Sequence, residues 1–143
     1  MSPERQIENL IYRYAQLLDL GDIPAVAELF SRAKFLGPGG DVQAEGAGAI
    51  EAIYRKFTRL YAEGTPLTHH VTTNVMIEVT GDTAAAHSYF TVFQATESLP
   101  LQPIIAGRYS DQFAHDDTGW YFTARQMLPR LSGDLSQHLG APV

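Results

Sequence analysis

His70 is the residue of this sequence best suited to acid–base chemistry, because an imidazole titrates near neutral pH and can accept or release a proton. It lies in the stretch 67–80, where frequent Val, Ile and Thr predict a strand. A general base also needs a partner that fixes its tautomer and stabilises the imidazolium. A hydrogen-bonded core histidine is the alternative interpretation, and spacing alone does not separate the two.

Asp19 is the acid that could partner His70, since it lies near the end of the first predicted helix. On a helical wheel it falls on the flank of the apolar stripe, where a solvated carboxylate is the ordinary expectation. Tyr14 lies within that stripe, which favours a core position. Its hydroxyl, once buried, needs a hydrogen-bond partner that a bound ligand could supply.

The other candidate ligand contacts come from a predicted hairpin with Gly81 and Asp82 at its tip. This tip predicts four directly opposed pairs: His70 with Phe93, Thr72 with Thr91, Asn74 with Tyr89, and Met76 with His87. Opposed residues share a face, and this face mixes polar and apolar side chains as small-molecule pockets do. We therefore expect four of them to contact a ligand beside His70: Asn74, Tyr89, Thr91 and Phe93.

The opposite face of the hairpin is predicted to be apolar. Its members are Val71, Val75, Ile77, Val79, Ala86, Phe90 and Val92. A face of this kind is not left in water. Because the helices can cover only one side of the sheet, we expect the apolar face to lie outside and to pair with a second subunit in a homodimer.

The remaining titratable side chains are weaker candidates. Five are expected to be peripheral, solvated or at an interface: His87, His115, His138, Arg108 and Arg125. His69 and His70 point to opposite faces of a strand and make a poor metal chelate. We therefore expect no metal site.

The chain around these residues divides into a helical first half and a strand-rich second half. Apolar residues recur at helical spacing after Pro3, Asp22 and Gly46, and Gly21 and Gly64 end the first and third helices. Strands are expected at 67–80, 84–97, 103–114 and 120–128. Their short connections favour antiparallel pairing, and helices followed by such a meander form an α+β fold. We expect one domain over 1–130 and a C-terminal tail over 131–143.

Composition excludes several classes of function. The chain has 143 residues, a formal charge of −6 and no cysteine, which excludes a disulfide scaffold, a thiol nucleophile and a thiolate metal site. Its few scattered basic residues argue against nucleic-acid binding. No apolar run approaches the roughly 20 residues of a transmembrane helix, and the N-terminal residues lack a signal-peptide pattern. We expect a cytoplasmic protein with neither nucleic-acid nor membrane partners.

Several segments together resemble the SnoaL-like family of the nuclear transport factor 2-like superfamily. They include IYRYAQLLDLGD at 11–22, THHVTTN at 68–74 and GRYSDQF at 107–113, with shorter matches at 46–50, 86–90 and 119–122. The resemblance implies a cystatin-like α+β fold, in which a curved antiparallel sheet forms a cone-shaped barrel around about three N-terminal helices. The family's pocket lies inside that cone.

The same resemblance implies roles for individual residues. Several family members use a His and an Asp, without metal or cofactor, to move a proton beside a carbonyl or a leaving group. In the dehydratase and dehydrochlorinase branch these residues match Asp19 and His70, with Asn74 and Tyr14 at substrate-contacting positions. The second histidine of scytalone dehydratase has no match, since Tyr89, Thr91 or Phe93 occupies its region.

Two functions are therefore expected from different classes. The first is a cofactor-independent lyase or isomerase, similar to a dehydratase or polyketide cyclase, that acts on a hydrophobic ring compound through a His–Asp dyad. The second is a non-catalytic ligand-binding or assembly subunit that resembles the small subunit of a ring-hydroxylating dioxygenase. A hydrogen-bonded pair of His70 and Asp19 beside a cavity favours the first, and a barrel packed solid favours the second.

Overall fold

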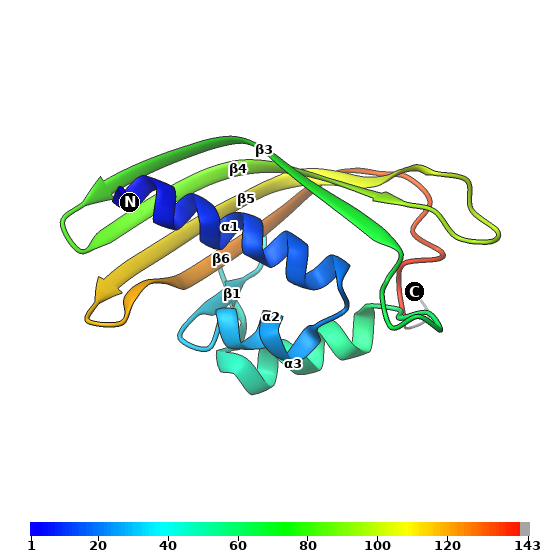
Figure 1. Cartoon of the computed structure of the whole chain (residues 1–143), viewed down its shortest axis with the longest axis horizontal. Helices are drawn as coiled ribbons and strands as arrows, with labels where there is room; N and C mark the ends of the chain where they lie inside the picture. The colour runs from blue at the N-terminus through cyan, green and yellow to red at the C-terminus, as the bar shows by residue number, and fades with distance from the viewer. Residues whose placement is uncertain (141–143) are drawn as a thin grey trace.

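A strongly curved sheet and three helices make up the computed structural model, which describes residues 1–140 (Figure 1). The helices are α1 (Pro3–Asp19), α2 (Ile23–Leu29) and α3 (Gly46–Phe57). The strands are β1 (Lys34–Leu36), β2 (Val42–Glu45), β3 (Thr68–Thr80), β4 (Thr83–Gln94), β5 (Gln102–Asp116) and β6 (Gly119–Ser132). All three helices lie on the concave side of the sheet, which confirms the predicted α+β class.

Helix α1 follows from its end signals and its apolar stripe. The Ser2 hydroxyl accepts a hydrogen bond from the Arg5 backbone N–H at 3.1 Å, and Pro3 occupies the first turn. The stripe is buried through Ile7, Ile11, Tyr14, Ala15 and Leu18. The chain then turns at Gly21, whose φ of +75° lies in the left-handed region. Asp19 is thereby the last residue of the helix.

Helix α3 is shorter than predicted. It ends at Phe57 rather than near Gly64, because Thr58 adopts an extended conformation and forms a β-bridge with Leu139. No helix within residues 1–140 is long and apolar enough to cross a membrane.

The six strands form one sheet in the order β2-β1-β6-β5-β4-β3. Neighbouring strands are antiparallel except β1 and β6, which pair in parallel, so the sheet is mixed rather than purely antiparallel. The long strands β3 to β6 form the meander expected from their short turns.

The register between β3 and β4 is only partly as predicted. Near the hairpin tip Met76 lies opposite His87, as expected. A bulge then follows at Asn74, which has a φ of +54°. Beyond the bulge the pairing shifts by one residue, so that His70 lies opposite Val92 and not Phe93. The predicted pairs Thr72 with Thr91 and Asn74 with Tyr89 are wrong for the same reason.

The shift changes which side chains share a face with His70. Alternate residues of β4 are buried on the inner face: Ala84, Ala86, Ser88, Phe90, Val92 and Gln94. Tyr89, Thr91 and Phe93 lie on the outer face, and Asn74 is exposed at the bulge. The expectation that these four residues line a pocket beside His70 is therefore wrong.

The predicted apolar face of the hairpin, apart from Val71, is likewise the inner one. Val75, Ile77 and Val79 pack against the core cluster, as do Phe90 and Val92. The helices cover this face, so the argument that it must pair with a second subunit does not hold. A homodimer stays a prediction without that support.

We predict that Gly21→Ala destabilises the fold by about 1–3 kcal/mol, because a Cβ there strains the backbone and overpacks the interior. Its Cβ would lie 2.0 Å from the Gly64 carbonyl oxygen. Gly48→Ala is the matched control, because a Cβ at that helical position meets no atom of the described structure within 4 Å. Urea unfolding should show lower stability for the first variant and equal or greater stability for the second. Equal losses in both would contradict the prediction.

Candidate active site

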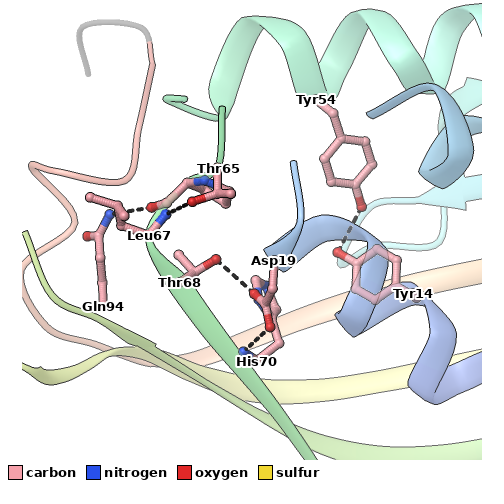
Figure 2. Close-up of polar contacts among 9 residues, drawn as sticks. Tyr14, Asp19, Tyr54, Thr65, Leu67, Thr68, His70 and Gln94 are labelled. Atoms are coloured by element: carbon pink, nitrogen blue, oxygen red, sulfur yellow. Dashed lines mark hydrogen bonds and ion pairs between the residues drawn. The ribbon is translucent and has the colours of Figure 1, made fainter. Parts of the chain in front are cut away.

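Asp19 and His70 form a hydrogen-bonded pair where the end of α1 meets the start of β3 (Figure 2). His70 Nδ1 lies 2.6 Å from Asp19 Oδ1. The His70 backbone N–H donates to Asp19 Oδ2 at 2.8 Å, and the Thr68 hydroxyl donates to Oδ1 at 2.8 Å. The His70 side chain is only 5% exposed, against 22% for Asp19. One carboxylate thus fixes both the backbone and the imidazole at this point.

The hydrogen bonds of the pair fix which of its atoms donate and which accept. Burial alone would raise the pKa of Asp19, but the hydrogen bonds from His70 and Thr68 outweigh it and lower the pKa below its ordinary value. Asp19 is therefore ionised at neutral pH, and an ionised carboxylate only accepts hydrogen bonds. His70 Nδ1 must then be the donor. A neutral His70 keeps the Nε2 lone pair for accepting a proton.

The segment before β3 is held in a conformation that L-residues rarely adopt. Leu67 has a φ of +56°, and its backbone N–H donates to the Thr65 hydroxyl at 3.2 Å. The Gln94 amide donates to the Pro66 carbonyl at 3.0 Å (Figure 2). Such backbone strain persists only when the surroundings enforce it. These contacts set where Thr68 and His70 enter the sheet.

A cluster of buried tyrosines lies beside the dyad. The Tyr14 and Tyr54 hydroxyls are 2.9 Å apart (Figure 2). The Tyr14 ring packs edge-on against His70, with 6.2 Å between ring centroids, and edge-on against Tyr109 at 5.9 Å. Burial raises the pKa of all three tyrosines, so they are neutral hydrogen-bond donors at physiological pH.

Arg125 lies at the centre of this cluster and not at the surface, so that prediction is wrong. Its side chain is 1% exposed, and its guanidinium binds Asp111 through two hydrogen bonds of 2.8 and 2.9 Å. A bulge between β5 and β6 shifts the register after Phe122 and turns Arg125 inward. Burial alone would lower the pKa of Arg125, but the Asp111 carboxylate outweighs it and keeps the cation charged.

A cavity of about 230 Å³ lies between α3, β1, β6 and the C-terminal segment 133–140. Most of its lining is apolar: Phe35, Leu36, Ile53, Phe57, Met127 and Leu139. Tyr54, Arg125 and His138 are among the polar groups of the wall. Apolar walls with a few placed polar groups are typical of small-molecule sites. His70 is not part of this lining, but Tyr54 connects the wall to it through Tyr14.

His138 is buried in part and is not the solvated residue predicted. The hydrogen bonds that anchor its segment include Arg59 N–H to the His138 carbonyl at 2.9 Å, Gly140 N–H to the Phe57 carbonyl at 2.9 Å, and the Gln94 amide to the Gln137 carbonyl at 3.1 Å. Burial, reinforced by the charge of His70, lowers the pKa of His138 to about 4. The predicted tail is thus ordered to residue 140, and its last three residues lie outside the described structure.

The structure therefore brings together Asp19, His70 and Tyr14 from the predicted set. Sequence reasoning missed Tyr54, Arg125 and His138, which supply the polar groups of the cavity. The spacing of these residues in the sequence does not indicate that they line a cavity. Tyr54 belongs to an ordinary apolar stripe, and His138 follows the last strand. Arg125 faces inward only because of a bulge. Among residues 1–140 no group of three or more His, Cys, Asp or Glu side chains could hold a metal ion.

Several solved structures share this fold. The chain is similar to a nuclear transport factor 2-like protein with a cystatin-like fold from Novosphingobium aromaticivorans, at 26% identity and a TM-score of 0.71, over 93% of this chain and 84% of the other. A proposed aromatic ring hydroxylase from the same organism is 25% identical, with a TM-score of 0.71 and 94% of each chain covered. A proposed scytalone dehydratase, also from that organism, is 23% identical, with a TM-score of 0.70 over 91% of this chain and 85% of the other, and shows the shared fold alone.

No curated protein matches the sequence significantly. The sequence profile of the SnoaL-like domain, however, matches residues 1–126. This match covers all three helices, both short strands and most of the meander. The chain therefore belongs to the SnoaL-like domain family.

Proposed function

We propose that this protein is a cofactor-independent lyase or isomerase that transfers a proton on a small hydrophobic ring compound. The observation that carries the proposal is the part-buried Asp19–His70 pair, which Tyr14 and Tyr54 connect to a mostly apolar cavity. General-base chemistry needs such a pair, in which one group takes the proton and the other fixes and stabilises it. Neighbouring folds that are named as dehydratases belong to the same reaction class.

The proposed reaction starts with His70 Nε2 as the base. It takes a proton from a carbon next to a ring carbonyl, so that a C–H bond breaks, an N–H bond forms, and the electron pair moves onto the carbonyl oxygen. Asp19 stabilises the imidazolium that results. Neutral Tyr54 and the guanidinium of Arg125 are the hydrogen-bond donors available for the negative oxygen.

The second half of the reaction returns the proton. In a lyase the electron pair comes back, the bond to a neighbouring hydroxyl breaks, and the imidazolium protonates the leaving group to water. In an isomerase the same proton returns to a different carbon. Substrate must contact both His70 and the cavity donors, so it has to pass the Tyr14–Tyr54 pair that connects them.

A non-catalytic ligand-binding or assembly role is the second candidate. The observation in its favour is that His70 is 5% exposed and does not line the cavity. One neighbouring fold, at 18% identity, is named as the β subunit of a proposed aromatic-ring-hydroxylating dioxygenase. Under this alternative the Asp19–His70 pair only holds α1 on β3.

We predict that His70→Ala lowers the rate of proton exchange by about a hundredfold or more, as loss of a positioned general base does. The measurement is deuterium uptake from D₂O at the carbon next to the carbonyl in a panel of ring ketones, followed by NMR. His69→Ala is the matched control, since the adjacent histidine is exposed on the outer face. Equal rates for both variants, or no uptake by the unmodified protein with any ketone, would favour the non-catalytic role.

We also predict that Asp19 stabilises the fold at neutral pH and ceases to do so in acid. Because its folded-state pKa is lowered, its contribution is complete above the unfolded-state value of about 3.9 and disappears as the pH falls through the folded-state value. The difference in unfolding free energy between the unmodified protein and Asp19→Asn should therefore shrink below about pH 4. Asp117→Asn, at the exposed turn before β6, is the control. If the difference in unfolding free energy stays constant between pH 7 and pH 3, the Asp19 carboxylate does not stabilise the fold in this way.

A further inference from the structure

The His138 side chain is partly buried at the C-terminal end of the described chain. The segment 133–140 is anchored by the His138 carbonyl, by Gln137 and by Gly140, and none of these bonds uses the imidazole. Its Nδ1 is buried and has no hydrogen-bond partner in the described part of the chain. Buried polar atoms normally have a partner. The imidazole nevertheless lies on the wall of the interior cavity.

Arg125 also lines the cavity, and one of its buried nitrogens likewise lacks a hydrogen-bond partner within the described residues. Arg125 uses Nε and Nη2 to bind Asp111, while its buried Nη1 is unpartnered within residues 1–140. A guanidinium nitrogen can only donate, so the missing partner of Arg125 is an acceptor. A neutral imidazole offers one N–H, and His138 can donate to the same acceptor.

The charge of the wall decides which acceptor fits. The buried Arg125–Asp111 pair has no net charge, and His138 is neutral at pH 7 because burial lowers its pKa to about 4. A carboxylate bound here would be a buried charge without a counter-ion, which is costly. A carbonyl oxygen accepts two hydrogen bonds and carries no net charge.

We propose that His138 and Arg125 bind the carbonyl oxygen of a ring ketone in this cavity, so that the C-terminal segment supplies a substrate-binding residue. The cavity of about 230 Å³ is smaller than the roughly 300–1,000 Å³ of pockets for drug-sized ligands, so the ketone has one or two fused rings. As a statement about substrate, the inference rests on the proposed function. As a statement about binding, it can be tested without turnover.

The first test compares three ligands of similar shape by calorimetric titration: α-tetralone, the hydrocarbon tetralin, and naphthoate. We expect α-tetralone to bind about tenfold more tightly than tetralin, because it satisfies two buried donors, and naphthoate to bind no better than tetralin. Equal binding of ketone and hydrocarbon, preferential binding of naphthoate, or no binding of α-tetralone at millimolar concentration would overturn the proposal.

The second test uses His138→Ala, His138→Gln and the control His115→Ala, an exposed histidine before the β5–β6 turn. The alanine variant should bind α-tetralone about three- to tenfold more weakly and tetralin equally well. Glutamine, which keeps an N–H donor, should restore part of the difference, and His115→Ala should change nothing. In protein labelled with ¹⁵N-histidine, the His138 nitrogen signals should shift with α-tetralone and not with tetralin. Unchanged ketone affinity in His138→Ala would overturn the proposal.

His70→Ala separates this inference from the proposed function. It should lose proton exchange and still bind α-tetralone within about twofold of the unmodified protein. His138→Ala should weaken ketone binding and also lower kcat, because the oxygen that His138 binds is the one that becomes negative in the proposed reaction. If the unmodified protein shows His138-dependent binding but no exchange, the proposed function fails and the binding site stands.

Discussion

The extra residue in β3 at Asn74 decides which side chains reach the interior. Strand residues alternate between two faces, so an uninterrupted strand with Ile77 and Val79 inside would place His70 outside. The bulge reverses this alternation, and asparagine suits it because it tolerates a positive φ better than most residues. The apolar half of the strand and His70 therefore both face the helices. The contact with Asp19 depends on that reversal.

The fold was predictable from the sequence because its signals are local and repeated. The Ser2 cap, the apolar stripe of α1 and the short turns between long strands all appear in the structure as expected. Asp19 could not be chosen by periodicity, since its position on the flank of α1 is ordinary for a solvated carboxylate. The resemblance to the SnoaL-like family singled it out instead.

The rest of the site was not predictable because single-residue irregularities control it. One bulge in β3 turns His70 to the inner face, away from the face that carries Tyr89, Thr91 and Phe93, and another turns Arg125 inward. Neither bulge has a periodic signature, and each reverses every assignment beyond it. His138 is beyond the last strand, where contacts with residues 57–59 and with Gln94 fix its place.

Two hydrogen-bonded polar pairs, Asp19–His70 and Arg125–Asp111, lie near each other within the fold. In one pair the Asp19 carboxylate is hydrogen-bonded to His70, and in the other the charged guanidinium of Arg125 binds Asp111. Tyr14 joins the two, since it packs against His70 and lies 4.5 Å below the guanidinium. His138 is a further titratable group near these pairs, and the charges of His70 and Asp19 shift its pKa in opposite directions.

Part of the cavity wall comes from residues beyond the segment that matches the family profile. The shared SnoaL-like profile ends at residue 126, yet part of the cavity wall comes from residues 127–139. Met127 lies on β6, whereas His138 and Leu139 follow the last strand of the sheet. A molecule in this cavity would therefore contact residues that the family profile does not include.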